Sequence, residues 1–590
     1  MLPHKQIEVR LQAAVRAVLP DADPAAVLVR PCPDTKFGDY QTTSLMALAK
    51  ARKMNPRQLA TDVLAKLDVN EVCEPVEIAG AGYLNFRLKP AVLTETLAAA
   101  ARGEHLFFAP TATPRTVVID FSSPNVAKPM HVGHIRSTGI GDSLQRVLRL
   151  LGHHVITDNH IGDWGTQFGK LLLGWKQRLD RAALERDAIA ELERLYKVIN
   201  AECDANPARL EEAKQELVKL QAGDEENLGL WAEMVQLSQI QFHTIYERLG
   251  VKFDHALGES FYNPQLGDVV NDLLKRGIAR ESEGAVGVFS DGSLPPKEDP
   301  FLVNRDGEWV ADPALVRKSD GGFNYTTTDL ATLDYRIKTW SPREIVYVVD
   351  DRQSPHFKKL FLTFARWQPD VARTVKLVHV GFGKILGEDG KPFKTRSGDT
   401  VKLADLLDEA EERAFQVVTA KSPESPEAQR REIACVVGLG AVKYADLLPN
   451  RQSDYLFSWD KMLALSGNTA PYLQYAYARI QSIFRKAEGT SNIQHSTSNI
   501  ELAAPEELAL AKHLLNFGLT LEAAADEYRP NFICNYLYEL AGHFTRFYEN
   551  CPVLKAEPAV RASRLALCDL TARVLQQGLA VLGIQTLPAM

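Results

Sequence analysis

Two histidines, His131 and His134, flank a glycine in the run His131-Val132-Gly133-His134. Residues three apart share one face of a helix, so both imidazoles can point at one ligand. Neutral imidazole carries a hydrogen-bond donor on one ring nitrogen, and glycine lets a ligand approach the backbone closely. This pattern predicts a cradle for a nucleotide phosphate. Because the motif is short, plain side-chain packing is an open alternative.

The segments around the histidines predict how they are positioned. The apolar run Val117–Ile119 is typical of a short buried strand. After the histidines, apolar residues recur at helical spacing up to about Gly152: Ile140, Leu144, Val147, Leu148 and Leu151. The motif therefore lies where a strand leads into a helix, at the carboxyl edge of a parallel sheet. α/β folds bind ligands at this edge, and the helix dipole favours phosphate there.

A second segment rich in glycine and cations runs from Gly381 to Lys402. Its basic residues are Lys384, Lys391, Lys394, Arg396 and Lys402. A mobile loop of this kind can close on a triphosphate and stabilise the charge that develops as pyrophosphate leaves. An exposed hairpin with solvated lysines is the alternative.

Length and composition restrict the class of protein. A chain of 590 residues exceeds what one hydrophobic core supports, so several domains are expected. Seven cysteines without a C-x-x-C pair argue against a disulfide framework and against a zinc site. No uncharged apolar run reaches membrane-spanning length, and the first residues lack a signal-peptide segment, so we expect a cytoplasmic protein without a membrane partner. The net charge of −7 argues against broad nucleic-acid binding but allows a local basic groove.

The order of patterns predicts a multidomain α/β protein. Residues 1–110 predict an α+β domain, and 104–116 a linker. Residues 115–403 predict a Rossmann-type domain with a helical insertion at about 181–245 and a β-rich insertion at about 284–325. Residues 404–455 predict a helical connecting segment, and 456–590 an all-α helical bundle. The charge of the 181–245 insertion predicts a solvated arm outside the core.

Five segments of the chain resemble motifs of one known family, and three of them are longer than the histidine motif and lie outside it. The segment from Ser122 to His134 resembles the HIGH region of class I aminoacyl-tRNA synthetases in its arginyl form, and Lys394-Thr395-Arg396-Ser397 resembles the KMSKS loop without its second lysine. Further similar segments follow in the family's order: 160–169 (HIGDWGTQFG), 325–330 (YTTTDL) and 468–476 (NTAPYLQYA). The resemblance covers essentially the whole chain.

The resemblance implies a reaction and its participants. ATP and L-arginine would form arginyl-adenylate, and the arginyl group would pass to the 3′-terminal adenosine of tRNA(Arg), with activation dependent on tRNA. ATP would bring Mg²⁺ as a substrate complex, and neither a protein-held metal nor a tightly bound prosthetic group is expected. The chain would act as a monomer.

The resemblance also assigns the nucleotide site. His131 and His134 would contact the ATP phosphates and stabilise the pentavalent phosphorus, and Gly133 would leave room for the nucleotide. Lys394 and Arg396 would act from the loop. Lys128 would replace the missing loop lysine.

A guanidinium substrate requires a carboxylate, because its donors pair bidentately with one. Asp329 is the candidate, although a carboxylate on a helix surface or at a cap is the ordinary alternative. By resemblance the remaining arginine-binding residues are Tyr325 in the same pocket, Gln353 as a hydrogen-bonding group, and Asp120, Ser122 and Asn125 at the α-amino and carboxylate ends.

Both ends of the chain carry candidates for tRNA contacts. Tyr83 and Asn85 would share one face of a strand, where an aromatic ring and an amide can contact an unpaired base. The resemblance implies that they read a D-loop nucleotide at the tRNA elbow, the alternative being a strand with core aromatics. The C-terminal helices resemble an anticodon-binding domain, with candidates at Tyr472 and Gln474. At helical spacing Tyr472, Tyr475 and Tyr477 cannot all face one way, so at least one is expected in the core.

Two other functions stay open at this point. One is a nucleotidylyltransferase acting on a small molecule, which would leave both terminal domains without a role. The other is a non-catalytic tRNA-binding paralogue, against which the intact His131, His134, Asp329 and Lys394 argue.

Overall fold

The computed structural model describes residues 1–393, 400–488 and 500–590. The chain forms two compact units. The terminal unit contains residues 1–111, 464–580 and 585–590. The second unit contains residues 112–463 and 581–584, and we call it the catalytic unit because the predicted nucleotide site lies in it. Within the described ranges no helix is both long enough and apolar enough to cross a membrane.

The centre of the catalytic unit is a parallel sheet of four strands in the order β13-β12-β5-β6. The strands are β5 (Thr116–Asp120), β6 (His154–Asp158), β12 (Glu344–Tyr347) and β13 (Lys376–His379). Their register places Asp120 opposite both Asp158 and Tyr347, so the last residues of three strands meet at one edge. From β5 the chain continues to β6 on one side of it and later to β12 on its other side. This change of side creates the crevice where such sheets bind ligands. The predicted α/β architecture is confirmed.

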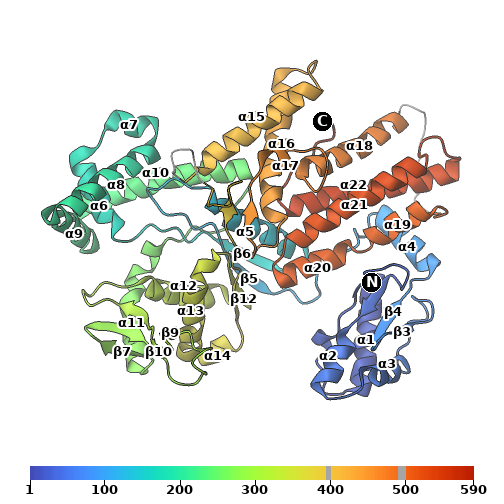
Figure 1. Cartoon of the computed structure of the whole chain (residues 1–590), viewed down its shortest axis with the longest axis horizontal. Helices are drawn as coiled ribbons and strands as arrows, with labels where there is room; N and C mark the ends of the chain where they lie inside the picture. Colours follow the sequence, from blue (N-terminus) through green and yellow to red (C-terminus); the bar gives the residue numbers. More distant parts are fainter. Residues whose placement is uncertain (394–399, 489–499) are drawn as a thin grey trace. The chain divides into compact units, whose positions relative to one another are not determined.

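Helices cover both faces of this sheet. Helix α5 (Gly133–Leu150) packs on β5 and β6, whereas α12 (Tyr325–Trp340) and α13 (Ser354–Trp367) pack on the opposite side (Figure 1). Val118 and Ile345 are fully buried against apolar residues of α12 and α13. Strands covered on both faces need apolar side chains in both directions, which explains the continuous apolar runs in the sequence.

The helical insertion is closer to the site than predicted. It follows α6 (Gln167–Arg178) and contains α7 (Arg181–Arg186), α8 (Ala188–Ala205), α9 (Pro207–Gln221) and α10 (Glu225–Leu249). The prediction of a solvated arm is wrong for α10, whose Met234, Ser238, Phe242 and Tyr246 are buried. These residues sit on one helical face, which packs inward while the charges face out.

The β-rich insertion begins a few residues earlier than predicted. It follows η2 (Glu259–Tyr262) and α11 (Asn263–Lys275) and contains β7 (Ala279–Ser282), β8 (Ala285–Val288), β9 (Leu302–Arg305), β10 (Glu308–Ala311) and β11 (Ala314–Arg317). β11, β8 and β7 form one antiparallel sheet, and β9 and β10 form a separate hairpin.

Short elements and two long helices complete the catalytic unit. They are η3 (Asp351–Gln353), α14 (Pro369–Ala372), β14 (Ile385–Leu386), α15 (Leu403–Lys421), α16 (Glu427–Leu447), β15 (Tyr455–Leu456) and α17 (Trp459–Met462). Helices α15 and α16 lie in the range 404–455 of the predicted connecting segment, apart from Leu403, the first residue of α15.

The terminal unit starts with an antiparallel sheet in the order β1-β2-β4-β3. Its elements are α1 (Pro3–Val18), η1 (Pro24–Ala26), β1 (Arg30–Pro31), β2 (Tyr40–Thr42), α2 (Ser44–Ala51), α3 (Pro56–Leu64), β3 (Glu77–Ala79), β4 (Tyr83–Phe86) and α4 (Pro90–Ala101). This confirms the predicted α+β fold.

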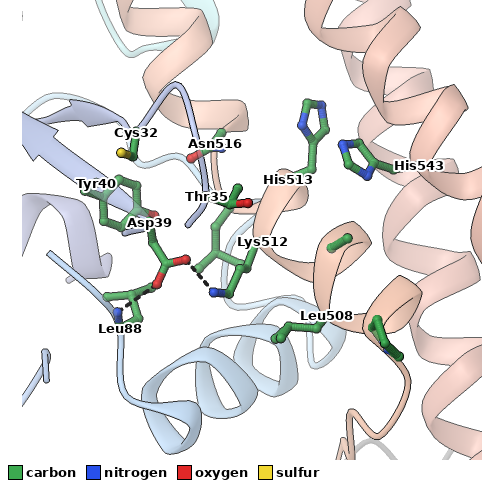
Figure 2. A pocket seen from close by; sticks show the side chains of 13 residues that line it. Cys32, Thr35, Asp39, Tyr40, Leu88, Leu508, Lys512, His513, Asn516 and His543 are labelled. Atoms are coloured by element: carbon green, nitrogen blue, oxygen red, sulfur yellow. Dashed lines mark hydrogen bonds and ion pairs between the residues drawn. The ribbon is translucent and has the colours of Figure 1, made fainter. Parts of the chain in front are cut away.

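The C-terminal part of the terminal unit is all-helical, as predicted. It contains α18 (Ala470–Glu488), α19 (Pro505–Leu514), α20 (Phe517–Glu527), α21 (Asn531–Asn550) and α22 (Pro558–Val581). A cavity of about 290 Å³ lies between α19 and the loop before β2 (Figure 2). There the Lys512 ammonium lies 2.6 Å from Asp39 Oδ1, which joins the N-terminal sheet to the helices.

Candidate active site

The two histidines begin helix α5 with their rings together. Their centroids are 4.0 Å apart. The His131 backbone N–H donates to His134 Nδ1 at 3.0 Å, and the Gly133 N–H donates to His131 Nδ1 at 3.1 Å. The tautomer with the proton on Nε2 lets each Nδ1 accept its backbone N–H and gives each ring an N–H donor on Nε2. His134 Nδ1 also lies 3.2 Å from His131 O. A Cβ on Gly133 would lie 2.9 Å from His131 Cε1, so only glycine leaves this ring in place.

Both rings are neutral at pH 7. Burial, with a smaller contribution from the neighbouring His131, lowers the pKa of His134 to about 3. Burial also lowers the pKa of His131, with a smaller contribution from Arg352. The pair is therefore a set of hydrogen-bond donors, which can hold a phosphate over a wide pH range.

The end of the predicted cation-rich loop contacts this motif directly. The Val132 N–H donates to Val401 O at 2.9 Å, and the Leu403 N–H donates to Met130 O at 2.9 Å. The loop therefore returns to the backbone of the histidine motif. Lys394 and Arg396 lie outside the described residues.

Lys128 is exposed just before the histidines. Its ammonium lies 5.4 Å from the ring centroid of Tyr196 on α8. The structure therefore shows a contact of Lys128 with the helical insertion, and its role toward ATP stays a prediction.

The loop after β5 has strained backbone angles and is held in place by hydrogen bonds to helix α10. Ser122, Ser123 and Ala127 all have positive φ (73°, 46° and 60°), which non-glycine residues rarely adopt. Helix α10 holds this loop, because Ser238 Oγ accepts from the Ala127 N–H at 3.0 Å and Tyr246 OH lies 2.7 Å from Ser122 Oγ. Such strain persists only where the surroundings enforce it, and it concentrates at functional sites.

These contacts change the interpretation of Ser122. Its side chain is buried, and its hydroxyl is shared between Tyr246 and the Thr138 hydroxyl at 2.9 Å. We therefore correct its predicted role from arginine contact to support of the loop. Asn125, by contrast, is exposed at the tip of the same loop. A Cβ on Gly162 would lie 2.3 Å from Asn125 Oδ1, which explains the glycine in the 160–169 motif.

Helix α12 carries the residues of the predicted arginine pocket. Asn324 caps this helix by accepting from the Tyr325 N–H, and Tyr325 and Asp329 follow on one helical face. His356 Nε2 of α13 lies 2.6 Å from Asp329 Oδ2. The His356 ring meets the Tyr325 ring edge-on at 4.8 Å. Asp329 is thus part of a built site and not a free surface carboxylate.

Two residues of this pocket were missed in the sequence. His356 lies 27 positions after Asp329 on another helix, so spacing could not reveal the pair. Glu259 in η2 is the second. Its pKa is raised to about 7, mainly by burial; His160 opposes this shift, and the charges of Asp329 and Asp163 add to it. Gln353 is exposed at the end of η3, immediately before the helix that carries His356.

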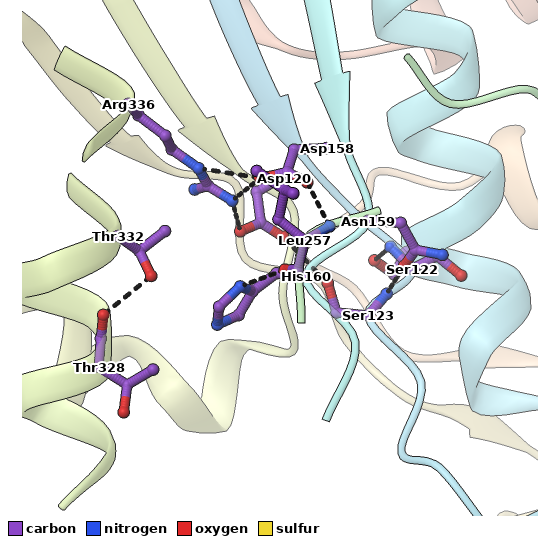
Figure 3. Close-up of polar contacts among 11 residues, drawn as sticks. Asp120, Ser122, Ser123, Asp158, Asn159, His160, Leu257, Thr328, Thr332 and Arg336 are labelled. Atoms are coloured by element: carbon purple, nitrogen blue, oxygen red, sulfur yellow. Dashed lines mark hydrogen bonds and ion pairs between the residues drawn. The ribbon is translucent and has the colours of Figure 1, made fainter. Parts of the chain in front are cut away.

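Asp120 ends strand β5 beside this pocket. Its Oδ2 lies 2.7 Å from Arg336 NH2, and its Oδ1 accepts from the Ser123 hydroxyl at 2.9 Å (Figure 3). Both oxygens are occupied by the protein, so Asp120 shapes the loop, and a direct contact to arginine stays a prediction.

Comparison with known proteins agrees with this geometry. Three protein-family models match the chain. The model of the class I (R) tRNA synthetase catalytic domain matches residues 98–459, that of the arginyl-tRNA synthetase N-terminal domain matches 5–88, and that of the DALR anticodon-binding domain matches 473–590. The chain belongs to the class I arginyl-tRNA synthetase family. The arginine–tRNA ligase of Chromobacterium violaceum is 45% identical over 100% of both chains, and that of Citrobacter koseri is 47% identical over 95% of each.

Solved structures of arginyl-tRNA synthetases share the fold over the whole chain. The Thermus thermophilus enzyme has a TM-score of 0.80 at 26% identity and covers 100% of both chains. The Plasmodium falciparum enzyme has a TM-score of 0.80 at 28% identity, with coverage of 100% and 99%. A match over all three domains does not favour the two other functions considered above.

The residues that the family resemblance predicts to contact tRNA lie in the terminal unit. Tyr83 is half-buried on β4, and Asn85 is buried on the same face. The two side chains share a strand face as predicted, but only Tyr83 offers accessible surface.

Helix α18 separates its tyrosines into two groups. Tyr477 is buried in the core, as expected of at least one of them, whereas Tyr475 is 48% exposed and Tyr472 packs edge-on against Tyr538. Gln474 is fully buried and donates to Gln585 O at 2.8 Å. A side chain inside the core cannot reach RNA, so we correct Gln474 from a tRNA contact to a structural residue.

Proposed function

We propose that this protein is an arginine–tRNA ligase that forms arginyl-adenylate from L-arginine and ATP and transfers arginine to tRNA(Arg). The observation that carries the substrate assignment is the contact of Asp329 Oδ2 with His356 Nε2 at 2.6 Å beside the Tyr325 ring, with a second acid, Glu259, close enough for the charge of Asp329 to raise its pKa. Two carboxylates in one partly buried pocket are unfavourable alone and become favourable when a guanidinium enters.

The histidine pair would act on ATP. The Nε2–H groups of His131 and His134 donate to phosphate oxygens and stabilise the charge that grows on the α-phosphate as the arginine carboxylate attacks. Because both rings are neutral, they donate without changing protonation. Lys128, Lys394 and Arg396 would neutralise the leaving pyrophosphate.

Arginine would bind with its guanidinium toward the acidic pocket. Asp329 pairs with the guanidinium, Glu259 adds a second acceptor, and the Tyr325 ring forms a wall. Asn125 and Gln353, both exposed, would hold the α-amino and carboxylate ends. Asp120 would set the position of the loop that carries Asn125.

The tRNA would engage the terminal unit. Tyr83 would stack on an unpaired D-loop base, with Asn85 beneath it, and Tyr472 and Tyr475 would contact anticodon bases. We further propose that arginine activation requires tRNA, as the family resemblance suggests.

Mg²⁺ would enter with ATP as MgATP. Among residues 1–393, 400–488 and 500–590 no cluster of three His, Cys, Asp or Glu side chains could hold a metal ion, so the proposal assigns no ligand to the protein. We propose a monomer, because one chain supplies every residue assigned to the site. We propose a cytoplasmic location, because ATP, arginine and tRNA are available there.

The test is ATP–pyrophosphate exchange with each amino acid, with and without tRNA. We expect exchange with arginine alone, and only when tRNA is present. Exchange with another amino acid, or no exchange under any condition, would contradict the assignment. Arginine exchange without tRNA would contradict only the tRNA requirement.

A further inference from the structure

A buried ion triad lies directly beneath the proposed arginine pocket. Arg336 on α12 is fully buried, and its NH2 group lies 2.7 Å from Asp120 Oδ2 and 2.8 Å from Asp158 Oδ2. Its Nε also donates to Asp158 Oδ2 at 3.2 Å. Burial alone would lower the pKa of Arg336, but the two carboxylates raise it well above its usual value, so the guanidinium is charged.

The triad joins the last residues of two neighbouring strands to a helix. Asp120 and Asp158 end β5 and β6 in register, and like charges there would repel without a cation between them. Figure 3 shows Arg336 reaching across to both carboxylates from α12. A planar guanidinium can bridge two carboxylates at fixed geometry, which the single ammonium of lysine cannot reproduce.

Each carboxylate uses its other oxygen to hold a segment of the pocket. Asp120 Oδ1 accepts from the Ser123 hydroxyl, in the strained loop that leads to Asn125. Asp158 Oδ1 accepts from the Leu257 N–H at 3.2 Å, two residues before Glu259.

The third segment is the helix of Arg336 itself. Tyr325, Asp329, Thr332 and Arg336 are spaced by four, three and four residues and so share one face of α12. Its first turns carry the pocket residues, and its third turn carries the guanidinium. One buried side chain therefore connects the loop of Asn125, the segment of Glu259 and the helix of Asp329.

We propose that Arg336 is the positioning residue of the arginine pocket: through Asp120 and Asp158 it sets the relative positions of the three segments that contact arginine. This inference rests on the proposed function. A buried ion triad is weak evidence for stability, because desolvation offsets its attraction, and the connectivity seen here supports a geometric role.

Two variants separate geometry from charge. Arg336→Lys keeps the charge but not the bridge. The double variant Arg336→Met with Asp158→Asn keeps the formal charge of the cluster at −1, as in the natural triad, and leaves no carboxylate pair to repel. The double variant leaves Asp120 as a single buried carboxylate that still accepts from the Ser123 hydroxyl, and an unpaired buried charge lowers stability, so thermal unfolding must show that this variant is folded at the assay temperature.

The measurement is tRNA-dependent ATP–pyrophosphate exchange, with thermal unfolding in parallel. We expect both variants to raise the KM for arginine about tenfold or more while the KM for ATP changes little, since a displacement of about 1 Å can reduce a rate 100-fold. Arg564→Lys is the matched control, because Arg564 pairs with the buried Glu507 at 2.7 Å in the terminal unit. It should lower the melting temperature without changing the KM for arginine.

A double variant with the natural KM for arginine would overturn the proposal, because charge balance alone would then explain Arg336. So would a parallel rise in both KM values with a loss of thermal stability, which indicates general destabilisation. Failure of the unmodified protein to exchange with arginine would instead refute the proposed function.

Discussion

His356 Nε2 lies 2.6 Å from Asp329 Oδ2, in a pair that is largely shielded from solvent. A carboxylate only accepts hydrogen bonds, so the imidazole donates from Nε2. The contact holds one carboxylate oxygen in a single orientation and leaves the other for substrate. We infer that His356 orients the acid that recognises the guanidinium.

Asp329→Asn should raise the KM for arginine about 100-fold, because removing one partner of a desolvated charge pair costs about 2–5 kcal/mol. His356→Gln should have a smaller effect, since it removes only the orienting contact. Both are measured by arginine-dependent exchange at saturating ATP and tRNA. An Asn variant with the natural KM would mean that another acid recognises the side chain of arginine.

His134→Asn should reduce kcat about 100- to 1,000-fold, the usual effect of removing a donor to transition-state charge. The Asn side-chain oxygen can still accept from the His131 N–H, as Nδ1 does, but no group replaces Nε2–H. His134→Gln is the matched control, because its amide reaches toward the position of Nε2. An equal loss of kcat in both variants would indicate that the His134 ring is needed for packing and not as a hydrogen-bond donor.

Arginine binding should strengthen as the pH rises through about 7. Burial raises the pKa of Glu259 to about 7, so the second acid becomes charged only near neutrality, and a charged Glu259 attracts the guanidinium. The KM for arginine should fall between pH 6 and 8 in the natural protein, and this change should be weaker in Glu259→Gln.

The same residue should act on stability with the opposite sign. The folded protein keeps the Glu259 proton up to about pH 7, whereas the unfolded chain releases it near its ordinary pKa of 4.5. The contribution of Glu259 to stability is therefore full below pH 4.5 and lost as the pH rises through 7. Glu259→Gln should raise the melting temperature at pH 8 more than at pH 5. An equal change at both values would show that the pKa of Glu259 is not raised.

Tyr83→Ala should raise the KM for tRNA about 5- to 100-fold, because stacking of one base on an aromatic ring is worth about 1–3 kcal/mol. Measured at saturating tRNA, its KM for arginine should be unchanged. Tyr83→Phe keeps the ring and should behave like the natural protein. If Tyr83→Phe raised the KM for tRNA as much as Tyr83→Ala, the hydroxyl group and not ring stacking would make the contact.

Local sequence patterns determined the elements of this protein. Apolar runs and helical spacing predicted the four parallel strands, helix α5 and the histidine pair at its start, because these features depend on neighbours in the chain. They also required one of the tyrosines of α18 to enter the core. The choice of Tyr477 came from the packing of α18.

Tertiary structure decided which residues share a site. Glu259, Asp329 and His356 lie on three separate elements, and Arg336 meets Asp120 and Asp158 from more than 170 positions away. The tertiary structure also buries Ser122 and Gln474, which gives both residues a structural role in place of the predicted contacts with arginine and tRNA. Periodicity specifies the face of a single helix or strand, but burial and long-range ion pairs arise only when those faces meet.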